Sequence, residues 1–134
     1  MDILSFDDLL QAARAQSQPQ RLLFVFTGVE LPEDSTPVQR TRFEAGQGGA
    51  LVPLMCVDKR PEEISSFAAL VQESSQFGHA WGLVFAAALG GRADRAPTSD
   101  DAEEPLQRMV ESIKQGNIGA FIPFDPQGQP VQFG

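Results

Sequence analysis

Cys56 is the one side chain of this sequence that could act as a thiol nucleophile, because the chain has a single cysteine. Asp58 and Lys59 follow it, and a nearby cation lowers the pKa of a thiol and favours the reactive thiolate. The alternative is a small apolar residue buried in a strand, since Cys56 belongs to the apolar run Leu54 to Val57 and free cysteines are among the most buried side chains. With no C-x-x-C pair present, the buried thiol is the favoured interpretation. Cys56 and Asp58 are the candidates for catalysis.

A second set of residues could bind an anion such as a phosphate or a carboxylate. Gly90, Gly91, Arg92 and Arg95 lie in the polar stretch GGRADRAPTSDD. Glycine lets backbone amides approach a ligand closely, and arginine holds oxyanions through paired hydrogen bonds. Lys59 could join them from a neighbouring loop. The alternative is a mobile surface loop with ordinary solvated charges, since no G-x-G-x-x-G or Walker A spacing supports the anion site.

The composition argues against metal and nucleic-acid sites. One cysteine and one histidine make a zinc site of such ligands implausible, and we predict no metal and no other cofactor. A net charge of −8, with Lys and Arg scattered along the chain, argues against binding to a phosphate backbone. Pairs of adjacent carboxylates fall at expected helix starts, where they complement the helix dipole. These pairs are Asp7 and Asp8, Glu62 and Glu63, Asp100 and Asp101, and Glu103 and Glu104.

The element expected to position these side chains is a central strand from Arg21 to Gly28. Leu22 to Phe26 is continuously apolar, without the alternation of a strand that has one wet face, and Gly28 ends the run too soon for a buried helix. Such a strand needs helices on both faces. Helices are expected at Phe6–Gln16, at Thr36–Ala45, from Pro61 to a cap at Gly78, and from Pro105 to Gly116.

Four further strands complete the expected sheet. They are Ala50–Asp58, Trp81–Leu89, and a terminal hairpin of Gly119–Phe124 and Pro130–Phe133. Pro53 lacks an N–H group, which places the first of them at a sheet edge. Helices between strands usually form crossovers between parallel strands. The sequence therefore predicts one α/β domain over residues 1–134, with helices on both faces of a mostly parallel five-stranded sheet. The expected strand order is 2-1-3-4-5, as in flavodoxin-like folds; a thioredoxin-like sheet is the alternative.

In a parallel sheet, ligands bind beyond the carboxyl ends of the strands, where the strand order reverses. That rule would gather three loops at one rim: Thr27–Ser35, Asp58–Pro61 and Gly90–Asp101. The rim would then hold Glu30 together with Asp58, Lys59, Arg92 and Arg95. We also expect the loop Gly90–Asp101 to be the most mobile part of the chain.

The chain reads as a soluble protein of the cytoplasm. At 134 residues it can bury a core without disulfides, and no apolar run approaches the roughly 20 residues that span a bilayer. The first residues carry Asp2, Asp7 and Asp8 where a signal peptide would be basic. We therefore predict no membrane association.

Nearly the whole chain resembles a family of short proteobacterial proteins of about 130 residues, whose function is not established. The resemblance rests on SFDDLLQAAR, QRLLFVFTGVELP, RFEAGQGGALVPLMCVDK and IPFDPQGQPVQF. Some members are labelled ribonucleotide reductase subunit alpha. The large reductase subunit is a much longer chain with a radical cysteine and a redox-active cysteine pair, whereas this chain has one cysteine. The resemblance implies a bacterial cytoplasmic protein and assigns no catalytic residue.

These observations favour a non-catalytic binding or regulatory module, because no nucleophile and base stand at a recognisable spacing. The second hypothesis is a protein or enzyme that binds a small anionic or phosphate-bearing ligand at the strand-end rim. A third is a homodimer, or a complex with another protein, formed through an edge strand or through the terminal hairpin with Phe121, Phe124 and Phe133.

Overall fold

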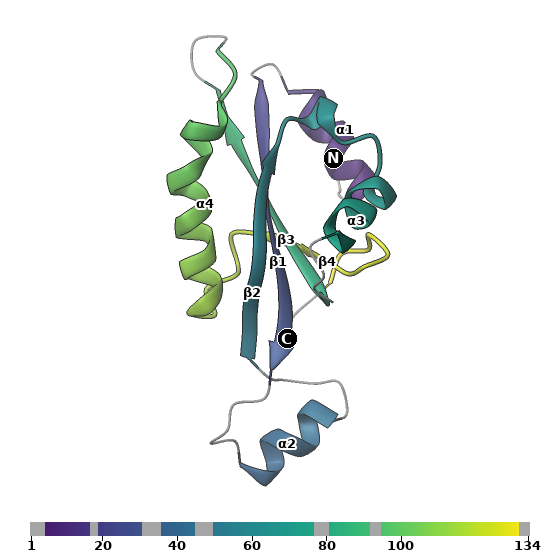
Figure 1. Ribbon diagram of the computed structural model, residues 1–134, viewed down its shortest axis with the longest axis vertical. Coiled ribbons are helices and arrows are strands. Elements are labelled where there is room, and N and C mark those ends of the chain that lie inside the picture. Colours follow the sequence, from purple (N-terminus) through teal and green to yellow (C-terminus); the bar gives the residue numbers. More distant parts are fainter. Residues whose placement is uncertain are drawn as a thin grey trace.

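A computed structural model describes residues 5–16, 19–30, 36–44, 50–76, 81–91 and 95–131. Its elements are α1 (Phe6–Arg14), β1 (Gln20–Glu30), α2 (Pro37–Glu44), β2 (Ala50–Lys59), the short 3-10 helix η1 (Pro61–Glu63), α3 (Phe67–Ser75), β3 (Leu83–Gly90), α4 (Ser99–Lys114) and β4 (Ile122–Phe124). The sheet forms a middle layer, with α4 on one face and α1 and α3 on the other, while α2 lies beyond the ends of β1 and β2 (Figure 1).

The sheet has four strands in the order β2-β1-β3-β4, and every neighbouring pair is antiparallel. The prediction of a mostly parallel five-stranded sheet is therefore wrong. The reason lies in the β1–β2 connection. The described side chains of α2, residues 37–41, are exposed, so this helix does not pack on the sheet as a crossover helix would, and β1 and β2 form a long hairpin with α2 at its tip (Figure 1).

β1 is covered on both faces, as its apolar run predicts. Leu22, Phe24 and Phe26 belong to the core under α1 and α3, and the alternate residues Leu23 and Val25 belong to the core under α4. All five side chains are buried. Fully burying one such side chain is worth roughly 1.5–3 kcal/mol, and among the described elements β1 contributes the most buried hydrophobic side chains.

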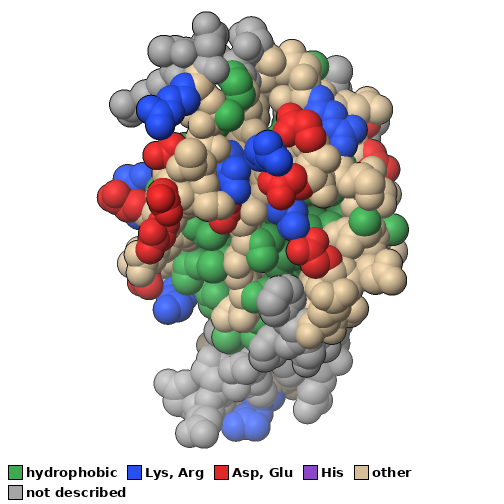
Figure 2. Space-filling model, turned by 45° about the horizontal axis from the view of Figure 1, so that its top comes forward, with side chains coloured by type: hydrophobic (Ala, Val, Ile, Leu, Met, Phe, Trp, Pro, Cys, Tyr) green, Lys and Arg blue, Asp and Glu red, His purple; other side chains and the backbone are tan. Residues whose placement is uncertain are grey.

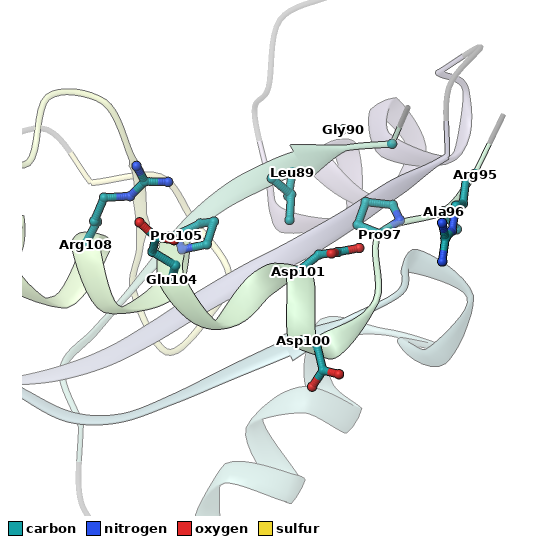
Figure 3. Close-up of a pocket in the computed structure, with 11 residues that line it drawn as sticks. Leu89, Gly90, Arg95, Ala96, Pro97, Asp100, Asp101, Glu104, Pro105 and Arg108 are labelled. Carbon is teal, nitrogen blue, oxygen red and sulfur yellow. The ribbon is translucent and has the colours of Figure 1, made fainter. Parts of the chain in front are cut away.

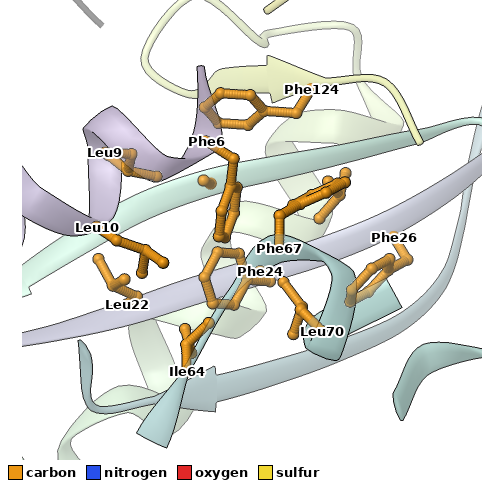
Figure 4. Close-up of a cluster of buried hydrophobic side chains, with 12 residues drawn as sticks. Phe6, Leu9, Leu10, Leu22, Phe24, Phe26, Ile64, Phe67, Leu70 and Phe124 are labelled. Carbon is orange, nitrogen blue, oxygen red and sulfur yellow. The ribbon is translucent and has the colours of Figure 1, made fainter. Parts of the chain in front are cut away.

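Phe6 is the centre of the core on the α1 side (Figure 4). Its ring lies 4.7 Å from that of Phe67 and 5.3 Å from that of Phe124, measured between ring centroids. Ser5 caps α1 by accepting a hydrogen bond from the Asp8 amide at 3.3 Å. The cap fixes where the helix begins. It therefore places the buried Phe6 against Phe67 of α3 and Phe124 of β4.

Two helices begin at other residues than the pattern predicts. α4 starts at Ser99 rather than Pro105, because Thr98 and Asp101 form a reciprocal capping box and this outweighs the proline inside the helix. The expected helix from Pro61 divides into η1 and α3, and Ser66 caps α3 through the Ala69 amide at 3.1 Å. The cap predicted at Gly78 lies outside the described residues.

The chain end folds back beside β4. The Gly128 amide donates to the Asp125 carbonyl at 3.0 Å, closing the expected turn, and Gly128 takes the left-handed φ of 79° that favours glycine. Phe124 and Pro130 form an antiparallel bridge, while residues 132–134 lie outside the described part. Among the described residues, no helix combines the length and the apolar character that crossing a membrane requires.

Candidate functional site

Asp58 lies in a network of hydrogen bonds that joins β1, β2 and α4. Its Oδ2 atom accepts from Arg21 Nε at 2.5 Å and from Ser99 Oγ at 2.7 Å. Arg21 Nη2 also reaches Ser99 Oγ at 2.6 Å. Arg21 is buried, and Ser99 is the first residue of α4. The network therefore fixes the start of α4 against the sheet.

This arrangement gives Asp58 a structural role. One carboxylate oxygen, Oδ2, accepts hydrogen bonds from both Arg21 and Ser99, so that oxygen is engaged in holding the two elements together. His79, the single imidazole, lies outside the described residues. The sequence analysis did not identify Arg21 and Ser99 as partners of Asp58. The position of Arg21 at the start of a buried apolar strand could have indicated such a partner, because a buried guanidinium group needs a carboxylate to pair with.

Cys56 is exposed, so the prediction of a buried thiol is wrong. Cys56 lies on β2, the outer strand of the sheet, and the elements packed on the sheet leave its side chain exposed. Desolvation raises the pKa of the thiol, and the Asp58 carboxylate raises that pKa further. The cation expected to lower it is elsewhere: Lys59 Nζ lies 2.9 Å from Glu73 Oε1. These effects disfavour a thiolate nucleophile.

The expected rim is only partly assembled. Leu22 pairs with Lys59 and Gln20 pairs with Gly90, so the ends of β2 and β3 lie at one end of the sheet. Glu30 pairs with Ala50 at the other end, because β1 runs in the opposite direction. Successive side chains of a strand point to opposite faces of the sheet, so the neighbours Asp58 and Lys59 are separated: Asp58 faces α4 and Lys59 faces α3.

Part of the predicted anion site does come together in a pocket of about 630 Å³. Gly90, Gly91 and Arg95 line it, whereas Lys59 does not. Arg92 lies outside the described residues. The remaining lining residues come from the end of β3, the segment before α4 and the first turns of α4 (Figure 3). These are Leu89, Ala96, Pro97, Asp100, Asp101, Glu104, Pro105 and Arg108.

The charges of this pocket are of both signs. Arg95 and Arg108 favour an anion, whereas Asp100, Asp101 and Glu104 oppose one. Part of this acidic character is structural, since the Asp101 carboxylate accepts from the Thr98 amide at 3.0 Å. In the described part of the chain, no group of three or more His, Cys, Asp or Glu side chains could hold a metal ion.

β2 is the outer strand on one side of the sheet, which confirms the edge position predicted from Pro53. From Leu51 to Val57 it carries only apolar side chains. Cys56 is exposed and the others are half-buried, with Leu51, Met55 and Val57 packed in part against the cores. A continuous hydrophobic surface is visible below the band of charged side chains in Figure 2. Long apolar edge strands of this kind are sites of association with other chains.

The backbone of β2 also has groups directed away from the sheet. The Gly91 amide donates to the Pro19 carbonyl at 2.9 Å, so odd-numbered residues of β1 face β3 and even-numbered ones face β2. In the β1–β2 register, Met55 and Val57 are therefore bonded to β1. The N–H and C=O groups of Cys56 and Asp58 point outward, where another strand could pair with them.

Comparisons with known proteins return no match: no family model, no curated protein and no solved structure is similar to this chain. The resemblance to short proteobacterial proteins stays a prediction. The fold is an antiparallel α/β domain, and within the described residues no strand pairs with the outer side of its apolar edge strand β2.

Proposed function

We propose that this protein is a non-catalytic binding module that docks another protein chain through the outer edge of β2, and that its first partner is β2 of a second copy. The observation that carries the proposal is the apolar segment Leu51–Val57 on a sheet edge, half-buried except for the exposed Cys56. Strand addition to such an edge uses backbone hydrogen bonds for affinity and the flanking side chains for fit.

A second copy is a suitable partner because an antiparallel edge complements itself. Two β2 strands related by a two-fold axis would present identical surfaces to each other and would join the sheets into one. All strand pairs of the sheet are antiparallel already, so the added pair would continue the same pattern.

The charges of the chain are compatible with this interface. A net charge of −8 opposes association of two copies, but β2 has no ionisable carboxylate or cation before Asp58. Asp58 and Lys59 are already held by Arg21 and Glu73 within one chain. The interface would therefore bury few unpaired charges.

Pro53 restricts where the strands can pair. It has no N–H group, and the register between β1 and β2 shifts beside it, between Phe26 and Thr27. Both features interrupt a regular ladder. The pairing segment we propose is therefore Met55–Lys59, with Leu51 and Leu54 adding apolar contacts beside it.

The test is the mass of the protein in solution, measured by light scattering from about 1 to 200 µM, with Cys56→Glu as the variant. When Met55–Lys59 pairs with the same segment of a second copy, residue 56 lies opposite Asp58 of that copy, so a glutamate there places like charges across the interface and should give a monomer. Gln107→Glu is the matched control, because it adds the same charge to an exposed residue of α4. A wild-type chain that stays monomeric throughout, or a control that dissociates equally, would contradict the proposal.

A second candidate function is the binding of a small anionic ligand in the pocket at Gly90. Gly90, Gly91 and Arg95 line this pocket together with Arg108, which supports the sequence-based hypothesis in part. Nucleotides, sugar phosphates and dicarboxylates should then raise the melting temperature of the wild type but not of the double variant Arg95→Ala with Arg108→Ala. The absence of any shift for the wild type would exclude this candidate.

A further inference from the structure

β3 extends beyond the strand that pairs with its outer side. β4 pairs with Val84, Phe85 and Ala86 only, whereas β3 continues to Gly90. Before β4 the chain turns away, because the Phe121 amide donates to the Ile118 carbonyl at 3.1 Å. Among the described residues, no strand lies beside Ala87–Gly90 on that side of the sheet.

The open segment presents backbone groups in a regular pattern. Odd-numbered residues of β3 face β1, as the bond from the Gly91 amide to the Pro19 carbonyl requires. On the other side, the Pro123 carbonyl accepts from Val131 and so points away from β3. The N–H and C=O groups of Ala88 and Gly90 therefore point toward the open side, and both residues are exposed.

The pocket of about 630 Å³ lies at the end of this open segment, where Leu89 and Gly90 line it, between β3 and α4 (Figure 3). Leu89 contributes an apolar side chain from the strand, and Pro105 contributes one from the helix. Asp101, Glu104 and Arg108 follow one another on the flank of α4 that lines the pocket. A strand placed beside Ala88 would thus have backbone partners on one side and a helix with charged side chains above it.

We propose that this groove binds an extended peptide segment of another protein that carries a lysine or arginine, and that the segment adds as a strand to β3 opposite Ala88. Backbone pairing would supply sequence-independent affinity, and a side chain of the segment would enter the groove. The site is separate from the β2 edge, so it goes beyond the proposed self-association.

Charge complementarity selects a basic segment. Asp100 and Glu104 line the groove, and the chain as a whole has a net charge of −8, so both the local and the long-range potential attract a cation. Arg95 and Arg108 stand at the rim and would hold an acidic residue or a carboxylate beside the basic one. Three carboxylates line the groove against these two arginines, so it favours a basic segment over the small anion of the second candidate function.

The binding test uses two matched libraries of acetylated and amidated octapeptides. In both libraries, every second position is Val, Ile or Thr, and the positions between them are Thr except for one. That one position is Lys in the first library and Glu in the second. Fluorescence anisotropy should detect binders in the Lys library only. Glu104→Lys should weaken them about tenfold or more, because it places like charges together. Glu103→Lys, an exposed neighbour that does not line the groove, should leave affinity nearly unchanged.

Amide hydrogen exchange, followed residue by residue by NMR, tests the geometry. Without peptide, the outward Ala88 amide should exchange fast and the Leu89 amide, bonded to β1, slowly. A bound Lys peptide should slow exchange at Ala88 by about tenfold or more, while Leu89 stays as it was. Binding without protection at Ala88, binders only in the Glu library, or no binders at all would each overturn the proposal. The monomeric variant Cys56→Glu should bind the same peptides, which separates this site from the β2 edge.

Discussion

Arg21 and Asp58 form a nearly buried ion pair between neighbouring strands, with Arg21 Nε 2.5 Å from Asp58 Oδ2 and side chains only 10% and 21% exposed. Because Ser99 bonds to both residues, the pair fixes α4 to the sheet. Removing one partner leaves a desolvated charge behind, which is far costlier than losing an exposed pair.

We therefore expect Asp58→Ala to lower the free energy of unfolding by about 2–4 kcal/mol. Lys59→Ala is the matched control on the next residue. It breaks the more exposed pair with Glu73 and should cost at most about 1 kcal/mol. Urea denaturation followed by circular dichroism measures both values. Equal losses for the two variants would show that the network does not hold the start of α4.

Cys56 should react slowly for an exposed thiol. Desolvation and the Asp58 carboxylate raise its pKa above the ordinary value of 9.0, so at pH 8 the folded chain has a smaller thiolate fraction than the unfolded chain. Alkylation by iodoacetamide should be slower in the native protein than in urea, and the difference should close once the pH exceeds the raised pKa. A native rate above the unfolded rate at pH 8 would contradict this.

The same shift has a small consequence for stability. Below the ordinary pKa of 9.0 the thiol is protonated in both states, so it changes nothing. As the pH rises from 9.0 through the raised pKa, the unfolded chain loses this proton first, and stability falls. Cys56→Ser removes the titration. Its unfolding free energy should therefore fall less than that of the wild type over this pH interval, which urea titrations at pH 8 and pH 10 would show.

Gly91 and Gly90 should respond differently to alanine. A Cβ on Gly91 would collide with the carbonyl oxygen of Arg95, whereas a Cβ on Gly90 would meet Gln20 Nε2 at an ordinary 3.5 Å. We expect Gly91→Ala to cost about 1–3 kcal/mol, as other overpacked sites do. Gly90→Ala should change the unfolding free energy by no more than about 0.5 kcal/mol. Chemical denaturation of the two variants, compared with the wild type, measures the difference; a neutral Gly91→Ala would show that the backbone there can move.

The places of four strands and the doubly covered core could be predicted from the sequence, whereas the fifth strand and the parallel strand directions were wrong. Leu22–Phe26 is apolar without interruption, which identifies a strand covered on both faces in a parallel or an antiparallel sheet alike. The helical pattern beginning at Pro37 was interpreted as a crossover. The described side chains of α2 are instead exposed, including Val38 at 64%. A capped helix at the tip of a hairpin and a capped helix packed on a sheet begin with the same sequence pattern, so the pattern does not distinguish them.

The candidate sites were predictable only in part, for related reasons. Gly90, Gly91 and Arg95 line one pocket because they are close together in the sequence. Lys59 was expected beside them, but the alternation of β2 directs it to the other face. The partners of Asp58 are Arg21 and Ser99, which are 37 and 41 residues away in the sequence. Such contacts depend on the strand register and on where α4 begins, and no local sequence pattern indicates either.

The most direct test of the proposed self-association is amide hydrogen exchange along β2 at low and high protein concentration. The Cys56 and Asp58 amides point outward, and Met55 and Val57 are bonded to β1. Strand pairing between two copies should make exchange at Cys56 and Asp58 slower as the concentration rises, while Met55 and Val57 stay protected throughout. Fast exchange at Cys56 and Asp58 at every concentration, in a protein whose Met55 and Val57 amides remain protected, would contradict the account.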